Sequence, residues 1–368
     1  MRTSRNFAWP LAAVLFGLTL LPTTARAKSA DCPVEPKTGV PLVSGDVYAG
    51  ANCTVNSPTD VDGFTFNANS GDIYQVIVGI SGGDQNVCMK LIDPNGMQIF
   101  AGCSGVGGGG FPYVLDDVTV TVAGTYTVDI SEAGAGTVSY GVSLERLFPT
   151  PADAKPALLG QLITGTISPV ADTPAFTFTG VTTGQFQVAA SLPVAEPNLC
   201  ETVYSPKGVS VASGCTMFAE GGNPFIDLVF TPTQAGTYLV ILNEATNSAT
   251  TNYDFEVSCV SGNCGKTNGP PLCTLKDSAS YSASTSTLTM NFTVENTSVT
   301  TWNAWLTSQD TITNLFSQSQ PITNPAQVIT KTTPLSPAGT VGVLTTFTTP
   351  TKGIICSNYT QVKTGTPP

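Results

Sequence analysis

The chain carries Asn86-Val-Cys88, Pro94-Asn-Gly96, Gly102-Cys103 and Gly124-Thr-Tyr126, and each segment returns 112 residues later. The second copies are Asn198-Leu-Cys200, Pro206-Lys-Gly208, Gly214-Cys215 and Gly236-Thr-Tyr238. The offset is constant over the whole stretch, from the first cysteine to the last tyrosine. A single register of this length indicates an internal duplication, so two copies of one fold make up most of the chain.

Apolar and polar residues alternate around these segments, which is typical of β-strands with one buried face. Phe64 and Phe66 lie two residues apart, and Phe176 and Phe178 repeat them at the same offset. No segment of about 10–12 residues shows helical periodicity. The sequence therefore predicts an all-β fold of three consecutive β-sandwich domains, of jelly-roll or immunoglobulin-like type.

The start of the chain reads as a secretory signal peptide covering residues 1–27. Arg2 and Arg5 precede an apolar run, and Ala25-Arg-Ala27 matches a small-x-small cleavage site. The apolar run is too short for a membrane-spanning helix, and no later run reaches the required length of about 20 residues. We therefore expect export without a transmembrane segment, to the extracellular space, with the periplasm and the cell surface as alternatives.

Domain boundaries follow from the duplication. The two copies occupy residues 28–148 and 156–260, and the proline-rich stretch between them is expected to be a linker. Residues 265–368 share no register with the copies and are rich in Ser and Thr. Alternation in this last part predicts a third, immunoglobulin-like sandwich, since apolar residues recur at Leu288, Met290, Phe292 and Val294.

All ten cysteines follow residue 27, and an even number in an exported protein favours disulfides over metal or redox sites. The duplication pairs Cys88 with Cys103 and Cys200 with Cys215. Proximity in the chain suggests three further bonds, Cys32–Cys53, Cys259–Cys264 and Cys273–Cys356. The last would tie the first strand of the third domain to its final strand.

Charge and composition exclude several classes of function. The net charge is −11 and becomes about −14 without the three arginines of the signal peptide. This balance argues against nucleic acid and anionic membranes as partners. The chain has no histidine, which removes Ser-His-Asp and Cys-His catalysis and histidine-ligated zinc.

Each copy resembles the bacterial pre-peptidase C-terminal (PPC) domain. The resemblance rests on Asp60-x-Asp62-x-Phe64-x-Phe66, on Asp93-Pro-x-Gly96, and on Ala-Gly-Thr-Tyr at 123–126 and 235–238. It implies a compact antiparallel jelly-roll sandwich that is appended to secreted proteases and other exported enzymes, with related forms that bind collagen or calcium. The second copy departs from the pattern at Pro174 and Ser205, which replace Asp62 and Asp93.

Three acids of the first copy are candidate calcium ligands, namely Asp60, Asp62 and Asp84. Ca²⁺ is a hard cation that prefers carboxylate and carbonyl oxygens. The alternative is that these acids accept hydrogen bonds from nearby backbone in turns. Gly79-Ile-Ser-Gly-Gly83 matches the nucleophile-elbow pattern, but no helix or histidine accompanies it, so we expect a loop there.

Trp302 and Trp305 are the only tryptophans after the signal peptide. Being three apart, they face opposite sides of an extended strand. One is expected in the core, and the other can be an exposed anchor for a sugar or a protein. The alternative is that both are buried.

These features favour a secreted, non-catalytic protein that serves in binding, adhesion or structure. Its ligand would be a protein, a polysaccharide or a matrix surface, and Ca²⁺ is the only cofactor considered. One alternative is an accessory or targeting protein of a secreted hydrolase. Another is a glycosidase that uses two carboxylates, since the acids are spread widely along the chain.

Overall fold

The computed structural model describes residues 29–364 except 36, 84–85, 105–112, 162, 193–198, 217–224, 246–248, 266–274, 283, 286, 295–300, 309–310, 320–326, 335–338 and 350–352. Every regular element in this part is a β-strand, and the strands form six sheets. The all-β prediction is confirmed. With no helix among the described residues, none is long and apolar enough to cross a membrane.

Unit 1, residues 29–148, consists of two five-stranded sheets. One has the order β1 (Ser29–Ala30), β3 (Val47–Val55), β10 (Val138–Phe148), β5 (Ile73–Gly83), β8 (Tyr113–Thr119). The other has the order β2 (Val40–Pro41), β4 (Asp62–Ala68), β9 (Gly124–Glu132), β6 (Val87–Ile92), β7 (Gln98–Cys103).

Unit 2, residues 155–262, repeats this plan with one strand fewer. Its sheets run β12 (Ile163–Ile167), β19 (Thr251–Gly262), β14 (Gly184–Ser191), β17 (Phe225–Phe230), and β11 (Lys155–Pro156), β13 (Ala175–Gly180), β18 (Gly236–Glu244), β15 (Leu199–Tyr204), β16 (Ser210–Cys215). Each strand matches one of unit 1 in order and pairing. The strand without a counterpart is β1.

Each unit has its own core between its two sheets. Phe64 and Phe66 of β4 point inward in unit 1, and Phe176 and Phe178 of β13 do so in unit 2, all at most 4% exposed. The alternation seen in the sequence therefore identifies the buried faces. Aromatic rings continue the packing, as in the stacked pair Phe66 and Tyr126, whose centroids are 5.4 Å apart.

The C-terminal unit contains a three-stranded and a four-stranded sheet. They run β20 (Leu275–Ser282), β21 (Thr287–Val294), β24 (Gln327–Pro334), and β23 (Thr311–Ser319), β22 (Thr301–Ser308), β25 (Gly339–Thr349), β26 (Gly353–Thr364). The first strand, β20, contacts the last, β26. The predicted bond Cys273–Cys356 starts at a residue outside the described part, although Cys356 lies on β26.

Four predicted disulfides are present: Cys32–Cys53, Cys88–Cys103, Cys200–Cys215 and Cys259–Cys264. Cys88 and Cys103 are direct partners across β6 and β7, and Cys200 and Cys215 are direct partners across β15 and β16. These two bonds therefore brace the same hairpin in both copies.

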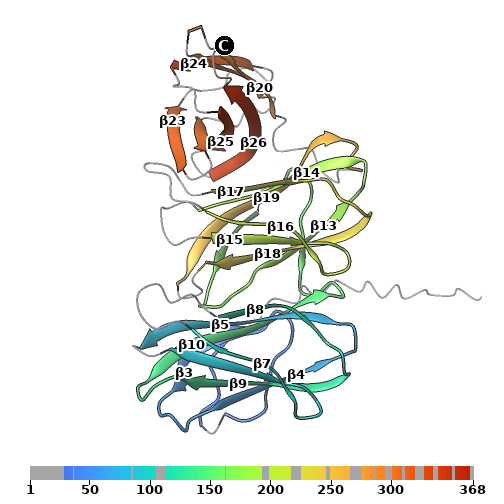
Figure 1. Ribbon diagram of the computed structural model, residues 1–368, viewed down its shortest axis with the longest axis vertical. Helices are drawn as coiled ribbons and strands as arrows, with labels where there is room; N and C mark the ends of the chain where they lie inside the picture. Colours follow the sequence, from blue (N-terminus) through green and yellow to red (C-terminus); the bar gives the residue numbers. More distant parts are fainter. Residues whose placement is uncertain are drawn as a thin grey trace, which may run out of the picture.

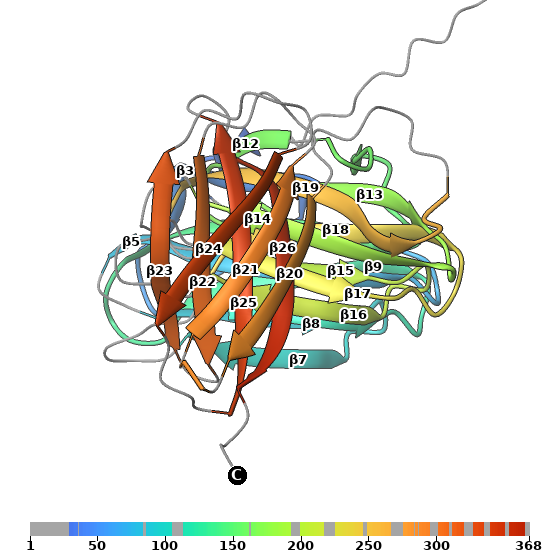
Figure 2. The ribbon, with the colours of Figure 1, turned by 90° about the horizontal axis from the view of Figure 1, so that it is seen from above.

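The three units follow one another along the long axis of the molecule (Figure 1), and Figure 2 shows the C-terminal strands crossing those below them. Units 1 and 2 share a small apolar cluster, in which Leu147 packs with Tyr204, Leu239 and Ile241. The stretch between the units, expected to be a linker, is part of this contact, since Ala154 packs against the cluster. The proline-rich connection is therefore packed between the units.

Candidate functional site

The acids that sequence analysis singled out in unit 1 meet a lysine that it did not. Lys37 is 1% exposed and lies beside Asp62, which is fully buried, with 3.1 Å between Nζ and Oδ1. Its ammonium also donates to Glu35 and, at 2.9 Å, to the carbonyl oxygen of Thr54. Because each charge has an opposite partner and further hydrogen bonds, this buried pair is compensated.

Tyr140 of β10 completes the cluster by donating its hydroxyl to Asp62 Oδ2 at 2.5 Å. Burial, and then the hydrogen bond to Asp62, raises the pKa of Tyr140 far above its usual range. Burial lowers the pKa of Lys37, but the hydrogen bonds to Glu35 and Asp62 outweigh that effect and raise it overall. Lys37 and Tyr140 therefore both keep their protons at neutral pH.

The N-terminal segment, residues 29–42, places Lys37 in the cluster. Its start, β1, pairs in parallel with the outer edge of β3, where Ala30 lies opposite Tyr48. A disulfide joins Cys32 to Cys53, and Asp31 accepts the main-chain N–H of Asn52 at 2.9 Å. The edge of β3 and the end of its sheet are thus covered by the protein's own chain.

The calcium hypothesis needs a vacant set of oxygen ligands. Carboxylate oxygens of Glu35, Asp60 and Asp62 lie within 4.8 Å of one another. Lys37 already holds two of these groups, so with Lys37 in place the donor set does not fit a divalent cation. Asp84, the third predicted ligand, lies outside the described residues. Calcium binding stays a prediction.

Unit 2 has the same corner without the N-terminal segment. Asp172 accepts the main-chain N–H of Ser168 at 3.1 Å, as Asp60 accepts that of Asn56 at 2.9 Å in unit 1. Tyr253 takes the place of Tyr140 on the central strand, while Pro174 replaces Asp62. The arrangement around Asp172 therefore copies unit 1 but lacks the buried ion pair.

The outer strand of the sheet also differs between the copies. In unit 1 the pairing of β3 with β10 jumps from Thr54 to Ala49, so residues 50–53 bulge outward and carry Cys53. In unit 2, β12 pairs with β19 over all five of its residues without interruption. Gly165, 112 residues after Cys53, offers no side chain for a covalent bond. The edge of β12 is therefore regular and pairs on one side only among the described strands.

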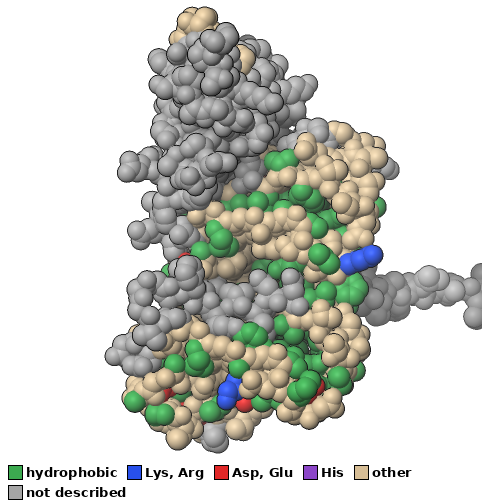
Figure 3. Space-filling model, in the orientation of Figure 1, with side chains coloured by type: hydrophobic (Ala, Val, Ile, Leu, Met, Phe, Trp, Pro, Cys, Tyr) green, Lys and Arg blue, Asp and Glu red, His purple; other side chains and the backbone are tan. Residues whose placement is uncertain are grey.

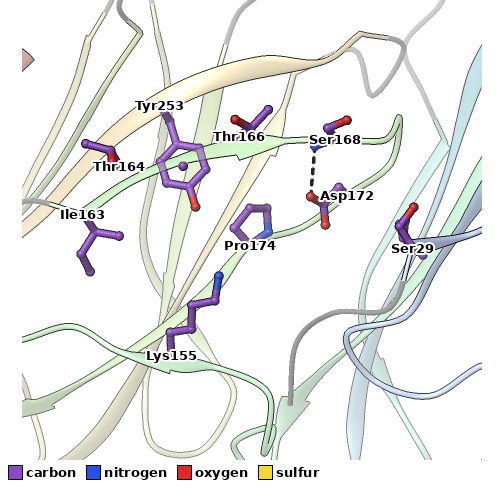
Figure 4. Close-up of a pocket in the computed structure, with 11 residues that line it drawn as sticks. Ser29, Lys155, Ile163, Thr164, Thr166, Ser168, Asp172, Pro174 and Tyr253 are labelled. Carbon is purple, nitrogen blue, oxygen red and sulfur yellow. Dashed lines mark hydrogen bonds between the residues drawn. The ribbon is translucent and has the colours of Figure 1, made fainter. Parts of the chain in front are cut away.

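A pocket of about 840 Å³ lies at this edge of unit 2 (Figure 4). Ile163, Thr164 and Thr166 line it from β12, and Ser29 and Val47 line it from unit 1. The Tyr253 hydroxyl and the Lys155 amine both point toward Pro174 in the close-up. The pocket therefore combines a strand edge, hydroxyl groups, one acid and one base.

Electrostatics single out Asp172 within this pocket. Burial raises the pKa of Asp172 to about 6, although backbone hydrogen bonds and the charge of Lys155 lower it. Burial and the charge of Asp172 also raise the pKa of Tyr253. Asp172 forms no ion pair within 4 Å, because the salt bridges of the described residues are both made by Lys37. A partly dehydrated carboxylate without a close cation is the main polar feature of the pocket.

The predicted aromatic site lies on the C-terminal unit. Trp302 and Trp305 both belong to β22, an inner strand paired with β23 and β25. The pairing with β23 shifts between Ala304 and Trp305. This strand is separate from the pocket of unit 2, so the two candidate sites do not combine.

Comparison with known proteins gives no family. No family profile matches the chain, and no curated protein matches it significantly. The pre-peptidase C-terminal domain of a collagenase from Bacillus anthracis matches 28% of this chain and 94% of its own, at 16% identity and a TM-score of 0.24. This is the domain type that the two copies resemble in sequence.

Two glycoside hydrolases also match. The glycoside hydrolase domain of Endo-D from Streptococcus pneumoniae R6 matches 64% of this chain at 10% identity and a TM-score of 0.19. A GH2 β-galacturonidase from Eisenbergiella tayi, bound to galacturonate, matches 52% at 9% identity and a TM-score of 0.17. The chain spans about a third of each hydrolase (35% in both cases). With TM-scores this low, the similarities indicate no shared function.

Proposed function

We propose that the protein is a secreted, non-catalytic binding protein whose ligand is a protein, a polysaccharide or a matrix surface. The observation that carries this proposal is the pocket of unit 2, in which Asp172 and Lys155 stand among hydroxyl groups of Ser, Thr and Tyr. Such mixed polar groups at a concave surface orient a ligand. The chain has no histidine to act as a general base beside a nucleophile.

Two further features support export and binding. Four disulfides are typical of a protein that matures in an oxidising compartment. The face seen in Figure 3 carries mainly hydrophobic and uncharged polar side chains, in line with a chain of which 11% is charged. Surfaces with few charges require little desolvation of ions when a ligand covers them.

An array of glycans and matrix proteins tests the proposal. We expect specific hits for the chain lacking residues 1–27, and Trp302→Ala/Trp305→Ala tests whether they depend on the C-terminal unit. Sequencing the N-terminus of the exported protein tests the signal peptide, with Lys28 expected first. An array without hits, or turnover of a polysaccharide by the protein, would contradict the function proposed.

A further inference from the structure

The two copies differ in one respect that bears on ligand chemistry. Unit 1 already contains a bound peptide, its own N-terminal segment, whereas the corresponding place in unit 2 is the pocket beside β12. We propose that this pocket receives an extended peptide segment of a partner protein, which lies along the free edge of β12 and places a basic side chain beside Asp172. The proposal rests on the function above and specifies its ligand.

The first argument is the geometry of the segment in unit 1. β1 adds a parallel strand to the outer edge of β3, with Ala30 opposite Tyr48. Tyr48 pairs with Val142, and the corresponding pair of unit 2 is Ile163 with Phe255. Ile163 lines the pocket. A peptide that pairs with β12 would therefore occupy the position that β1 occupies on β3, by the same addition of a strand to an edge.

The second argument is where the basic side chain goes. Lys37 reaches from the segment to the carbonyl of Thr54, and Thr54 lies opposite Ser139 on β10. The corresponding pair in unit 2 is Thr166 with Asn252, and Thr166 lines the pocket. Asp172 stands beside it, where Asp60 stands in unit 1. A lysine or arginine from a partner would meet a main-chain carbonyl and a carboxylate there.

The third argument is charge. Asp172 is surrounded by other acids, since Glu145 and Asp153 lie in the same junction and the charge of Asp172 raises the pKa of Glu145 further. Burial is the main cause of that raised pKa, followed by the charge of Asp153. Lys155 is the basic residue that lines the pocket, and it is exposed. A basic ligand thus complements the junction, and the net charge of −11 attracts it at long range.

The unit 1 segment itself supplies the probe. A fluorescent synthetic peptide with the sequence of residues 29–42, with serine in place of Cys32, is titrated onto the full chain lacking residues 1–27 and followed by anisotropy. The Cys32–Cys53 bond keeps the protein's own segment in unit 1, so the peptide reports on unit 2. We expect saturable binding, and hydrogen–deuterium exchange should show slower exchange of the β12 amides in its presence.

Matched variants decide the role of Asp172. Asp172→Asn keeps an acceptor for Ser168 and removes the charge, and we expect it to weaken binding by about tenfold or more, as for loss of a charge-assisted hydrogen bond. A peptide with methionine in place of Lys37 should lose affinity similarly on the wild-type protein. Asp60→Asn makes the corresponding change in unit 1 and should leave binding unchanged. Circular dichroism confirms that each variant is folded.

Three results would overturn the proposal: no binding of the peptide to the folded protein, equal binding by Asp172→Asn, or no slowing of exchange in β12. Failure here is distinguishable from failure of the proposed function. Array hits that persist without peptide binding would leave the protein a binding protein with another ligand. Glycan hits abolished by Asp172→Asn would assign the pocket to a sugar instead.

Discussion

Asp60 and Asp172 make the same hydrogen bond in the two copies, each to the main-chain N–H of the residue four positions earlier, yet one lies beside a buried lysine and the other beside a pocket. The local turn was therefore retained while its surroundings diverged. The difference comes from the chain that precedes each copy. Several consequences of this relationship can be measured.

Lys37 is expected to be essential for the stability of unit 1. Lys37→Met leaves Asp62 buried without its cation, and breaking one side of such a pair costs about 3–5 kcal/mol. Urea unfolding followed by fluorescence measures the change in the free energy of unfolding. Lys155→Met is the control, because Lys155 is exposed and forms no salt bridge among the described residues. Equal stability of Lys37→Met and wild type would refute the compensated pair.

Calcium is expected to compete with Lys37 for the same carboxylates. Removing the ammonium in Lys37→Gln leaves Glu35, Asp60 and Asp62 close together without a cation, and a ligand that binds only the folded state raises its melting temperature. We therefore expect Ca²⁺ to raise the melting temperature of Lys37→Gln more than that of the wild type in calorimetry. If chelator and calcium give identical curves for both proteins, the calcium hypothesis fails.

The sequence predicted the scaffold well and the site only in part. The offset of 112 residues located Phe176 from Phe64 and paired Cys200 with Cys215, because core and disulfide positions are fixed by local periodicity and by the duplication. It did not reveal Lys37, since the lysine lies before the repeat begins and reaches Asp62 only through the folded segment. Tyr140 and Tyr253 escaped as well, because their offset is 113.

The packed contact between units 1 and 2 predicts unequal effects at two matched glycines. Gly96 and Gly208 have the same turn conformation, with φ of +79° and +73°. A Cβ at Gly96 meets nothing within 4 Å, whereas one at Gly208 would lie 2.7 Å from the Cβ of Phe148. Gly208→Ala should therefore destabilise by about 1–3 kcal/mol more than Gly96→Ala, the usual cost of overpacking. Thermal unfolding measures both, and equal losses would mean that the contact is absent in solution.

Asp172 predicts a pH dependence of stability. Burial raises its pKa in the folded state to about 6, from an ordinary value of 3.8. The folded state therefore binds the proton more tightly, so this contribution to stability is complete below pH 3.8 and is lost as the pH rises through 6. Urea unfolding at a series of pH values should show a shallower decline between pH 4 and 6 for Asp172→Asn than for the wild type. Parallel curves would show that Asp172 titrates normally.

Lys155 offers an independent check of the same titration. Its charge lowers the pKa of Asp172 and so opposes the effect of burial. Lys155→Met should therefore move the decline in stability to higher pH. A shift to lower pH would mean that Lys155 does not act on Asp172.

The absence of a counterpart to β1 has a simple cause in chain length. Residues 29–39 precede β2 in unit 1, which allows the chain to run along β3 and still reach β4. Only residues 149–154 join β10 to β11, and an extended chain spans at most about 3.3–3.6 Å per residue. In any tandem array with so short a connector, every copy after the first must leave this corner uncovered. Connector length alone can thus divide identical domains into a closed leader and open followers.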